Sequence, residues 1–312
     1  MTVLLGLDAI PPGLHRPVIT MGSFDGIHRG HQKLLERVVE LAAENDGTPV
    51  LLTFEPHPQQ VVAPGTAPPL LTGRAEKLPL IEEAGIALTI ILTFNRELSE
   101  LAAEVFVRQV LVDRLGVAHL VLGHDHAFGR ERRGREELLQ RLAPELGFGI
   151  EVVDAVLDDG VAITSTVIRN LLAAGEVERA AHMLGRPYSL GGLVVRGEGR
   201  GRELGFPTAN LALEVNRKCM PGDGIYAVRV RVRGSTRSGA CSIGRRPTFG
   251  SGDRTIEVYL IDFEDDIYGD RIEVTFQARL RDELAFENPQ ELVEQMRRDV
   301  ENVQRLMSQE EY

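Results

Sequence analysis

Two histidines in a glycine-rich segment are the residues of this chain best placed to do chemistry. His28 and His31 lie three positions apart within residues 22–31, between an apolar run at 18–21 and an amphipathic run at 31–44. This pattern predicts a turn from a buried strand into a helix. Side chains three apart share one helix face, and the N–H groups and dipole at a helix start favour an anion. The segment predicts a phosphate-binding turn; a glycine-rich turn with two surface histidines is the alternative.

A second segment, residues 164–169, combines hydroxyl groups with a guanidinium. Ser165 or Thr166 can cap a helix that Gly175 ends, and Arg169 lies within one turn of the cap. A hydroxyl, free backbone N–H groups and a guanidinium together can hold a triphosphate. An ordinary capped helix with a surface arginine is the alternative.

Further candidates of the first half follow predicted strands, at the edge where open α/β sheets bind ligands. Phe54, His57 and Pro58 follow one strand, and Asp125 and Phe128 follow another. Asp125 offers a hydrogen-bond acceptor to a ligand or to its own loop. The phenylalanines are more typical of a pocket wall or a core, and a histidine between two prolines is more typical of a rigid turn.

The motifs of the common nucleotide-binding loops are missing from the sequence. There is no Gly-x-x-x-x-Gly-Lys-Ser/Thr, and no Gly-x-Gly-x-x-Gly follows a strand. Gly22, Gly26 and Gly30 instead remove side chains where a nucleotide would approach the backbone. No acid, base or nucleophile stands out. This suits attack on an α-phosphate by a phosphate already ionised at neutral pH, which needs positioning and charge neutralisation more than proton transfer.

The second half has a different set of chemical groups. Its glycine-rich stretch frees backbone N–H groups for phosphates, and Thr208 and Asn210 offer two neutral oxygen ligands for Mg²⁺. A surface hairpin rich in turn residues is the alternative. Glu257 opens a predicted strand and could take the proton of an attacking alcohol, but Glu283 and Asp262 compete with it on the sequence alone.

Two predicted domains would position these groups, with a boundary between residues 184 and 185. All eight histidines precede that boundary and all five tyrosines follow it. Before it, strand-like runs alternate with helix-like runs, which predicts a parallel sheet wrapped by helices. After it, short β-branched runs separated by glycine turns predict an antiparallel barrel or sandwich. An amphipathic run at 289–307 predicts a closing helix. Predicted strands cover 18–21, 50–54, 87–92, 119–122, 150–153, 190–196, 225–232, 238–243, 255–261 and 271–280, and the earlier helices cover 31–44, 73–84, 100–114 and 135–146.

Composition narrows the classes of partner. The chain has 312 residues and a formal charge of −11, so neither nucleic acid nor a membrane surface is an expected partner. Two cysteines are too few for a disulfide framework, and the start does not read as a signal peptide. We therefore expect a cytoplasmic protein acting on small molecules. The sequence gives no oligomeric state.

Taken together, these segments resemble the bifunctional prokaryotic riboflavin kinase/FAD synthetase family along essentially the whole chain. Residues 22–31, 54–58 and 165–169 are similar to its FMN adenylyltransferase module (1–184), an α/β nucleotidyltransferase domain of Rossmann-like fold. Residues 184–188, 207–210, 242–248 and Glu257 are similar to its riboflavin kinase module (185–312), a β-barrel with a C-terminal helix. Their order and spacing make the match specific.

The resemblance implies two reactions: riboflavin and MgATP give FMN and ADP, and FMN and a second ATP give FAD and pyrophosphate. A single working module, or a flavin-nucleotide-binding regulator without turnover, are the alternatives. His28 and His31 would be catalytic in the first module and Glu257 would deprotonate the ribityl hydroxyl in the second, a choice over Glu283 that rests on the resemblance. ATP in the first module would be held by Gly22, Phe24, Asp25, Gly26, His28, Gly30, His31, Ser165, Thr166 and Arg169, with the flavin beside Phe54, His57, Pro58, Asp125 and Phe128. ATP in the second would be held by Gly197, Gly199, Arg202, Gly205, Pro207, Thr208 and Asn210, the last two as Mg²⁺ ligands.

Four positions depart from the family pattern. His126 stands where an aromatic residue is usual, and Thr164 where serine is common. Ser242 replaces a usual asparagine and Tyr259 a usual histidine. The last two lie outside the proposed Mg²⁺ ligands, so we expect altered packing and retained kinase activity.

Overall fold

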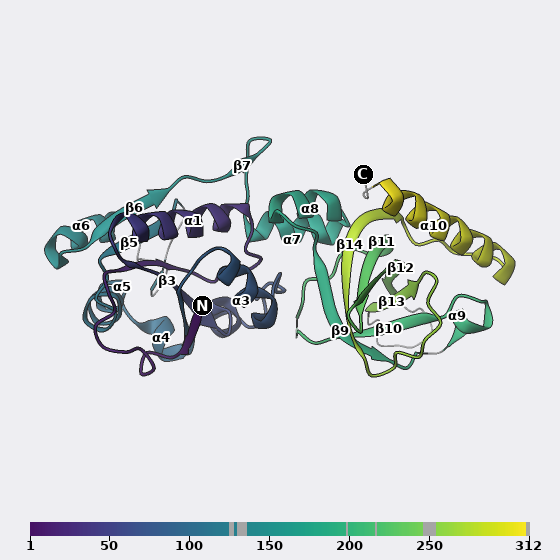
Figure 1. The fold of residues 1–312 in the computed structure, drawn as a ribbon, viewed down its shortest axis with the longest axis horizontal. Helices are drawn as coiled ribbons and strands as arrows, with labels where there is room; N and C mark the ends of the chain where they lie inside the picture. Colours follow the sequence, from purple (N-terminus) through teal and green to yellow (C-terminus); the bar gives the residue numbers. More distant parts are fainter. Residues whose placement is uncertain (125–127, 130–135, 198, 216, 246–253, 310–312) are drawn as a thin grey trace. The chain divides into compact units, whose positions relative to one another are not determined.

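The structure is a computed structural model that describes residues 1–309 except 125–127, 130–135, 198, 216 and 246–253, and except the side chains of Arg200 and Arg202. Contacts divide the chain into two compact units, Met1–Ser165 and Thr166–Tyr312. Each unit has its own sheet (Figure 1). The α/β class of the first half and the antiparallel barrel of the second are confirmed.

The first unit is built on a six-stranded, wholly parallel sheet in the order β1-β4-β3-β2-β5-β6. Residues of its strands alternate between two cores: Val18 and Leu51 face one, and Ile19 and Leu52 face the other. The strands are β1 (Thr2–Leu5), β2 (Pro17–Met21), β3 (Thr48–Glu55), β4 (Leu88–Thr93), β5 (His119–Gly123) and β6 (Gly149–Val153); a hairpin of β7 (Leu157–Asp158) and β8 (Val161–Ala162) follows.

Helices cover both faces of this sheet. The buried face of α1 (Arg29–Glu44) packs on the core that contains Val18, and α6 (Glu136–Leu146) packs on the core that contains Ile19. The helix predicted over 100–114 is instead a short α5 (Ala103–Phe106) that continues as a π-helix, η1 (Val107–Arg114). The other helices are α2 (Pro58–Val62), α3 (Arg74–Glu83) and α4 (Arg96–Glu100).

The second unit is a closed antiparallel barrel in the order β10-β13-β12-β11-β14-β9. Helix α10 (Pro289–Gln309) packs against β11 and β12 and buries Val303 and Met307 (Figure 1). The strands are β9 (Ser189–Val195), β10 (Thr208–Leu213), β11 (Gly224–Val232), β12 (Ser235–Arg245), β13 (Arg254–Leu260) and β14 (Arg271–Arg281), and a short helix, α9 (Arg200–Glu203), precedes β10.

Two helices between the halves of the sequence pack on the barrel. They are α7 (Ser165–Ala174) and α8 (Val177–Leu184). The guanidinium of Arg279 on β14 donates to the carbonyl of Ala174 at 2.8 Å, and the backbone N–H of Gly222 donates to the carbonyl of Leu172 at 2.7 Å. Packing therefore groups these helices with the second unit, whereas the module boundary at 184/185 stays a prediction.

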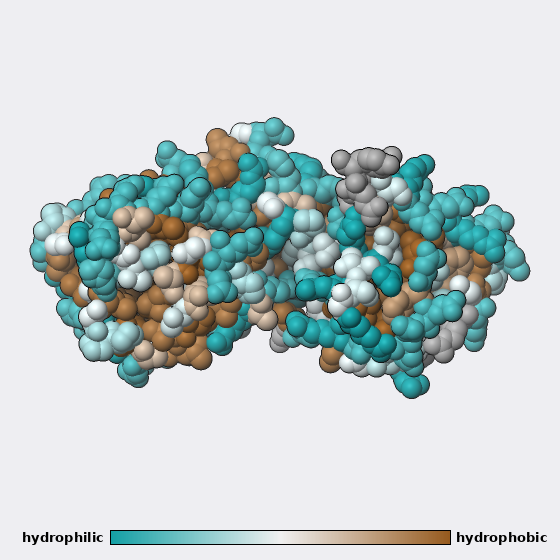
Figure 2. Space-filling model, in the orientation of Figure 1, coloured by the Kyte–Doolittle hydropathy of each residue, from teal (hydrophilic) through white to brown (hydrophobic). Residues whose placement is uncertain are grey.

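The surface in view is mixed: teal, hydrophilic residues alternate with brown, apolar ones over the lower part of the α/β unit and at the β7–β8 hairpin, where Leu157 and Val161 are exposed (Figure 2). Among the described residues, no helix is both long and apolar enough to cross a membrane.

Candidate active sites

The candidates of the first unit gather at the carboxyl edge of its sheet. Strands β3, β2 and β5 are neighbours, and chain order reverses between β2 and β5. Such a reversal is where open α/β sheets bind ligands. The glycine-rich segment follows β2, residues 56–58 follow β3, and residues 124–129 follow β5. The fold thus brings the glycine-rich segment and residues 56–58 to one edge of the sheet.

His28 and His31 form a stacked pair at the start of α1. Their ring centroids are 3.6 Å apart, and His28 Nδ1 accepts the backbone N–H of His31 at 3.3 Å. The helix begins at Arg29 with His28 as its N-cap, two residues earlier than expected, because the imidazole itself supplies the capping acceptor. The ideal Cβ of a residue at position 30 would lie 3.2 Å from His28 Nδ1. Glycine at Gly30 therefore lets the ring lie against the helix.

A buried carboxylate holds the loop before these histidines. Asp25 is 1% exposed and accepts the backbone N–H groups of Leu71 and Thr72 at 2.9–3.0 Å. Phe24 and Ile27 are buried in left-handed backbone conformations, with φ of 46° and 40°. Such conformations cost about 1–3 kcal/mol each and persist where surrounding contacts impose them. Asp25 thus fixes the loop, and a direct contact of its side chain with ATP stays a prediction.

The environment of His31 favours the neutral imidazole. Burial lowers its pKa well below the usual value, and the charges of His28 and Lys77 lower it further. Its Nδ1 is buried and has no hydrogen-bond partner among the described residues. At neutral pH this ring is therefore an uncharged group that can give or accept a hydrogen bond.

Lys77 is a site residue that the sequence analysis missed. It lies in the first two turns of α3, and its ammonium donates to the carbonyl of Ser23 at 2.7 Å, inside the glycine-rich loop. The one available signal was its position shortly after a predicted helix start, and this is too common to single out a residue.

The segment at 164–169 folds as a helix start, with one difference from the expectation. Ser165 and Thr166 are the first two residues of α7, so neither is its N-cap. The Ser165 hydroxyl instead donates to the carbonyl of Asp25 at 2.8 Å, which ties it to the loop that carries the histidines. Thr166 and Arg169 belong to the second compact unit, and their contacts with ATP stay predictions.

The residues predicted beside a flavin in the first unit have mainly apolar neighbours. Phe54 packs edge-on against Phe94 at 5.7 Å, and Phe128 packs against Phe106 at 5.8 Å. His57 caps α2, where its Nδ1 accepts the N–H of Gln59 at 3.2 Å, and Pro58 is the first residue of that helix. Their flavin contacts stay predictions, and Asp125 and His126 lie outside the described residues.

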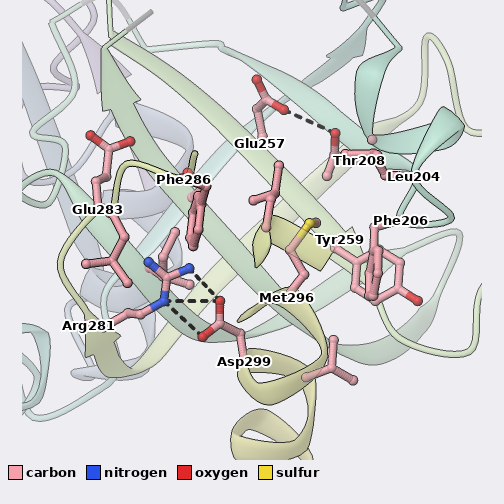
Figure 3. Close-up of a pocket in the computed structure, with 17 residues that line it drawn as sticks. Leu204, Phe206, Thr208, Glu257, Tyr259, Arg281, Glu283, Phe286, Met296 and Asp299 are labelled. Carbon is pink, nitrogen blue, oxygen red and sulfur yellow. Dashed lines mark hydrogen bonds and ion pairs between the residues drawn. The ribbon is translucent and has the colours of Figure 1, made fainter. Parts of the chain in front are cut away.

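The second site lies on two adjacent barrel strands, not in a loop. Thr208 and Asn210 point to the same side of β10, and Asn210 pairs with Glu257 of β13. The Thr208 hydroxyl donates to Glu257 Oε2 at 3.1 Å (Figure 3). Sequence reasoning missed β10 because Gly205 and Pro207 directly before it indicate a turn. The site thus has a rigid wall.

Glycines let the connection before β10 approach these side chains. A Cβ at Gly197 would overlap the Asn210 amide, and a Cβ at Gly201 would overlap the carbonyl of Phe206 and crowd the Thr208 hydroxyl. Gly199 and Gly205 have positive φ values of 75° and 82°, which L side chains rarely adopt. Arg202 lies on α9. The glycine-rich stretch therefore lies against the Thr208–Asn210 pair, as a phosphate-binding turn requires.

A cavity of about 330 Å³ opens beside Thr208 and Glu257. One part is apolar, and the other holds Glu283 and a buried ion pair in which Arg281 Nη2 lies 2.7 Å from Asp299 Oδ2 (Figure 3). Both family departures of the barrel, Ser242 and Tyr259, line it as well. The labelled apolar lining comprises Leu204, Phe206, Phe286 and Met296. A pocket of this size, with apolar walls and a few polar groups, is typical of a small-molecule site.

Three carboxylates were candidates for a base, and the structure separates them. Asp262 follows β13 in an exposed position, outside the cavity. Glu257 and Glu283 both line the cavity, and only Glu257 contacts Thr208. Burial raises the pKa of Glu283, and the Asp223 carboxylate raises it further, against the lowering effect of Arg254 and Arg281.

Comparisons with known proteins match the two halves of the chain to two different families. The FAD synthetase family model matches residues 11–167, and the riboflavin kinase family model matches residues 184–307. A "Bifunctional riboflavin kinase/FMN adenylyltransferase" of Pseudomonas fluorescens is 38% identical over 96% of both chains, and one of Escherichia coli K12 is 38% identical over 90% of both.

A solved structure from Streptococcus pneumoniae, described as a macrolide-efflux protein, matches with a TM-score of 0.88 and 29% identity, covering 97% of this chain and 99% of its own. It is similar to this chain along its full length. Because both family models match and relatives share a third or more of their residues over nearly the whole chain, this protein belongs to the bifunctional riboflavin kinase/FMN adenylyltransferase family.

Proposed function

We propose that the two sites carry out the two steps from riboflavin to FAD, one in each of the modules at 1–184 and 185–312. The barrel phosphorylates riboflavin with ATP to give FMN and ADP. The α/β unit adenylylates FMN with a second ATP to give FAD and pyrophosphate. The observation that supports this division is that each unit holds a separate phosphate-binding arrangement: the histidine turn at the carboxyl edge of the sheet, and the Thr208–Asn210–Glu257 group on the barrel wall.

In the α/β unit the FMN phosphate attacks the α-phosphorus of ATP. The new bond joins an FMN phosphate oxygen to the α-phosphorus, and the bond from the α-phosphorus to the bridging oxygen breaks, so pyrophosphate leaves. The attacking phosphate is already ionised at neutral pH, so no general base is required. His28, His31 and the N-terminus of α1 align and hydrogen-bond the phosphates, with Ser165, Thr166 and Arg169 as further ATP ligands and Phe54, His57, Pro58, Asp125 and Phe128 on the flavin side.

In the barrel the 5′-hydroxyl of the ribityl chain attacks the γ-phosphorus of ATP. Glu257 accepts the hydroxyl proton, the new oxygen–phosphorus bond forms, and ADP leaves. Gly197, Gly199, Arg202, Gly205 and Pro207 shape the turn that receives the phosphates. The flavin ring occupies the cavity between the barrel and α10.

The donor set on β10 fits Mg²⁺. A hydroxyl and an amide oxygen are hard, neutral ligands, and they lie on one face of the strand next to a carboxylate. The described residues contain no group of three or more His, Cys, Asp or Glu side chains that could hold a metal; Thr208 and Asn210 would hold the ion together with the nucleotide phosphates. When bound, the ion neutralises charge on the transferred phosphate.

Two substitutions test the division of labour. With riboflavin and MgATP, His31→Ala stops FAD formation while FMN still appears. Glu257→Ala stops FMN formation and leaves adenylylation of added FMN intact, and Glu283→Ala, which removes the other carboxylate of the cavity, keeps most kinase turnover. Chromatographic separation of the three flavins gives the result. Loss of both activities in either variant, or kinase turnover surviving in Glu257→Ala, contradicts the assignment.

The remaining assignments follow from charge and composition. The formal charge of −11 disfavours nucleic acid as a partner, and we propose that the partners are the small-molecule substrates, with modules at 1–184 and 185–312 and a cytoplasmic location. Salt-independent activity tests the absence of a nucleic-acid partner, and co-fractionation with soluble enzymes tests the cytoplasmic location.

A further inference from the structure

Lys77 adds a positive charge beside the stacked histidines of the first site. Its Nζ donates to the Ser23 carbonyl at 2.7 Å. Ser23 lies two residues beyond the end of β2, at the point of the sheet where chain order reverses. The ammonium therefore lies at the same sheet edge as the stacked histidines, and it is close enough to His31 for its charge to act on that ring.

Most of the hydrogen-bonding capacity of this ammonium is unused. An ammonium has three N–H donors, and within the described ranges the Ser23 carbonyl is the one acceptor it meets. Two carboxylates act on Lys77 from a distance, Asp25 and Glu55. Both have nearer partners: Asp25 accepts backbone N–H groups of Leu71 and Thr72, and Glu55 lies 3.5 Å from Arg74.

This charge is held where water solvates it poorly. Burial lowers the pKa of Lys77, against the raising effect of the two carboxylates. A half-buried cation without a contacting counter-ion costs free energy in the unliganded protein. An arrangement of this kind is typical of a site that an anion completes.

The choice of lysine here is itself informative. Of the 35 basic Lys and Arg residues, three are lysine: Lys33, Lys77 and Lys218. Lys33 reaches the Asp154 carbonyl at the surface, and Lys218 packs over the Tyr188 ring at 5.1 Å. A chain that uses arginine almost everywhere thus places a compact ammonium beside the histidines. A point charge suits one phosphate oxygen, whereas the broad arginine fork suits two.

We propose that the ammonium of Lys77 contacts a non-bridging phosphate oxygen during adenylyl transfer and is a further catalytic residue of the first site. The inference rests on the proposed adenylyltransferase function. His31 is uncharged at neutral pH and donates at most a hydrogen bond, whereas the Lys77 ammonium brings a full positive charge to the glycine-rich loop. It stays protonated throughout, while the bond to FMN forms and the bond to pyrophosphate breaks.

The phosphate oxygen belongs either to ATP or to FMN, and steady-state kinetics with each substrate varied distinguishes the two. Lys77→Gln keeps an N–H donor for the Ser23 carbonyl and removes the charge. We expect it to lower kcat/KM for FMN adenylylation by about 10²–10³, with the KM effect on ATP or on FMN naming the source. Riboflavin phosphorylation by the same preparation stays within twofold of the parent and reports the amount of folded barrel, and an unchanged thermal midpoint of the first unit reports that the substituted unit is folded. Lys33→Gln is the matched control and leaves both activities unchanged.

The pH profile separates charge from support of the loop. A neutral amine still donates to Ser23, so a supporting role predicts no alkaline loss. A charge on phosphate predicts that kcat/KM of the parent falls at alkaline pH, below the usual lysine pKa of 10.5, and that Lys77→Gln lacks this fall. The other titratable groups coupled to Lys77 are His31, Asp25 and Glu55, the last paired with Arg74, and Lys77→Gln leaves all of them in place.

Adenylylation by Lys77→Gln within about threefold of the parent, or an alkaline fall that persists in the variant, overturns the proposal. A parent protein that makes no FAD from FMN instead refutes the proposed function itself. The two failures are therefore distinguishable.

Discussion

The Gly197→Ala substitution tests whether the barrel site depends on the position of one amide. An ideal Cβ at position 197 overlaps the Nδ2, Cγ and Oδ1 atoms of Asn210, all within 3 Å. Ordinary contacts of a Cβ atom begin at about 3.4 Å, so a change of rotamer must move the Asn210 amide by roughly 1 Å. A misplacement of this size in a catalytic group costs about 10²-fold in rate.

We expect Gly197→Ala to change the free energy of unfolding only slightly. The φ of Gly197 lies outside the left-handed region, so alanine is compatible with its backbone. Alanine lowers the conformational entropy of the unfolded chain, which stabilises the folded state by about 0.4–1 kcal/mol. Moving Asn210 off its rotamer costs about 0.5–1.5 kcal/mol. The two terms nearly cancel, so the thermal midpoint of the barrel stays within a few degrees of the parent.

The assay is FMN formation from riboflavin and MgATP, with adenylylation of added FMN measured on the same sample. Riboflavin phosphorylation falls by about 10²-fold, and adenylylation does not change. Gly191→Ala on β9 is the matched control, because its Cβ meets nothing nearer than Arg271 Nη2 at 4.0 Å. Kinase turnover in Gly197→Ala equal to that of Gly191→Ala would refute the placement of Asn210 in the site.

Two further predictions concern stability. Burial lowers the pKa of His31 in the folded protein. Below about pH 6.5 the unfolded chain therefore binds a proton at this residue that the folded chain does not bind. The free energy of unfolding of the first unit then falls by up to about 1.4 kcal/mol for each pH unit below that value. Urea titrations from pH 7 to pH 5 measure the slope, and an equal slope in His31→Gln contradicts this origin. The second prediction concerns Asp299, which is 4% exposed and accepts hydrogen bonds from the Arg281 guanidinium at 2.7–3.2 Å. Asp299→Asn leaves Arg281 without its counter-charge and lowers the free energy of unfolding by about 3 kcal/mol. This corresponds to a fall of roughly 6–12 °C in the Tm of the barrel. Calorimetry checks this against Glu294→Gln on the exposed face of α10, and a shift below 2 °C contradicts it.

Sequence periodicity predicted the fold class because each half repeats one pattern. Alternating strand and helix runs in the first half require a parallel sheet, and the strand that ends at Met21 leads into the histidine turn as expected. Local signals failed where strand pairing in the barrel overrode them. Thr208–Leu213 forms a strand despite the turn residues before it, since its pairing with β9 and β13 is determined by the barrel.

The site was predictable to the extent that its residues are neighbours in sequence. His28 and His31 stack because three positions on a helix start bring them together. The contact of Thr208 with Glu257 joins residues 49 positions apart, and Lys77 reaches Ser23 across 54 positions. Only the strand order places such pairs together, and no local pattern encodes that order. The bond from Ser165 to the Asp25 carbonyl was hidden for the same reason.

Closure of the barrel limits how a substrate reaches the second site. Every strand has a hydrogen-bonded neighbour on both sides, so no seam between strands can part without breaking a ladder. Among the described residues, the sides of the cavity away from the barrel wall are formed by the connection before β10 and by the segment that leads into and includes α10, so ligands reach the site past these segments. The wall that bears Thr208 and Glu257 can thus keep its shape from one catalytic cycle to the next, while ligands pass the segments opposite it.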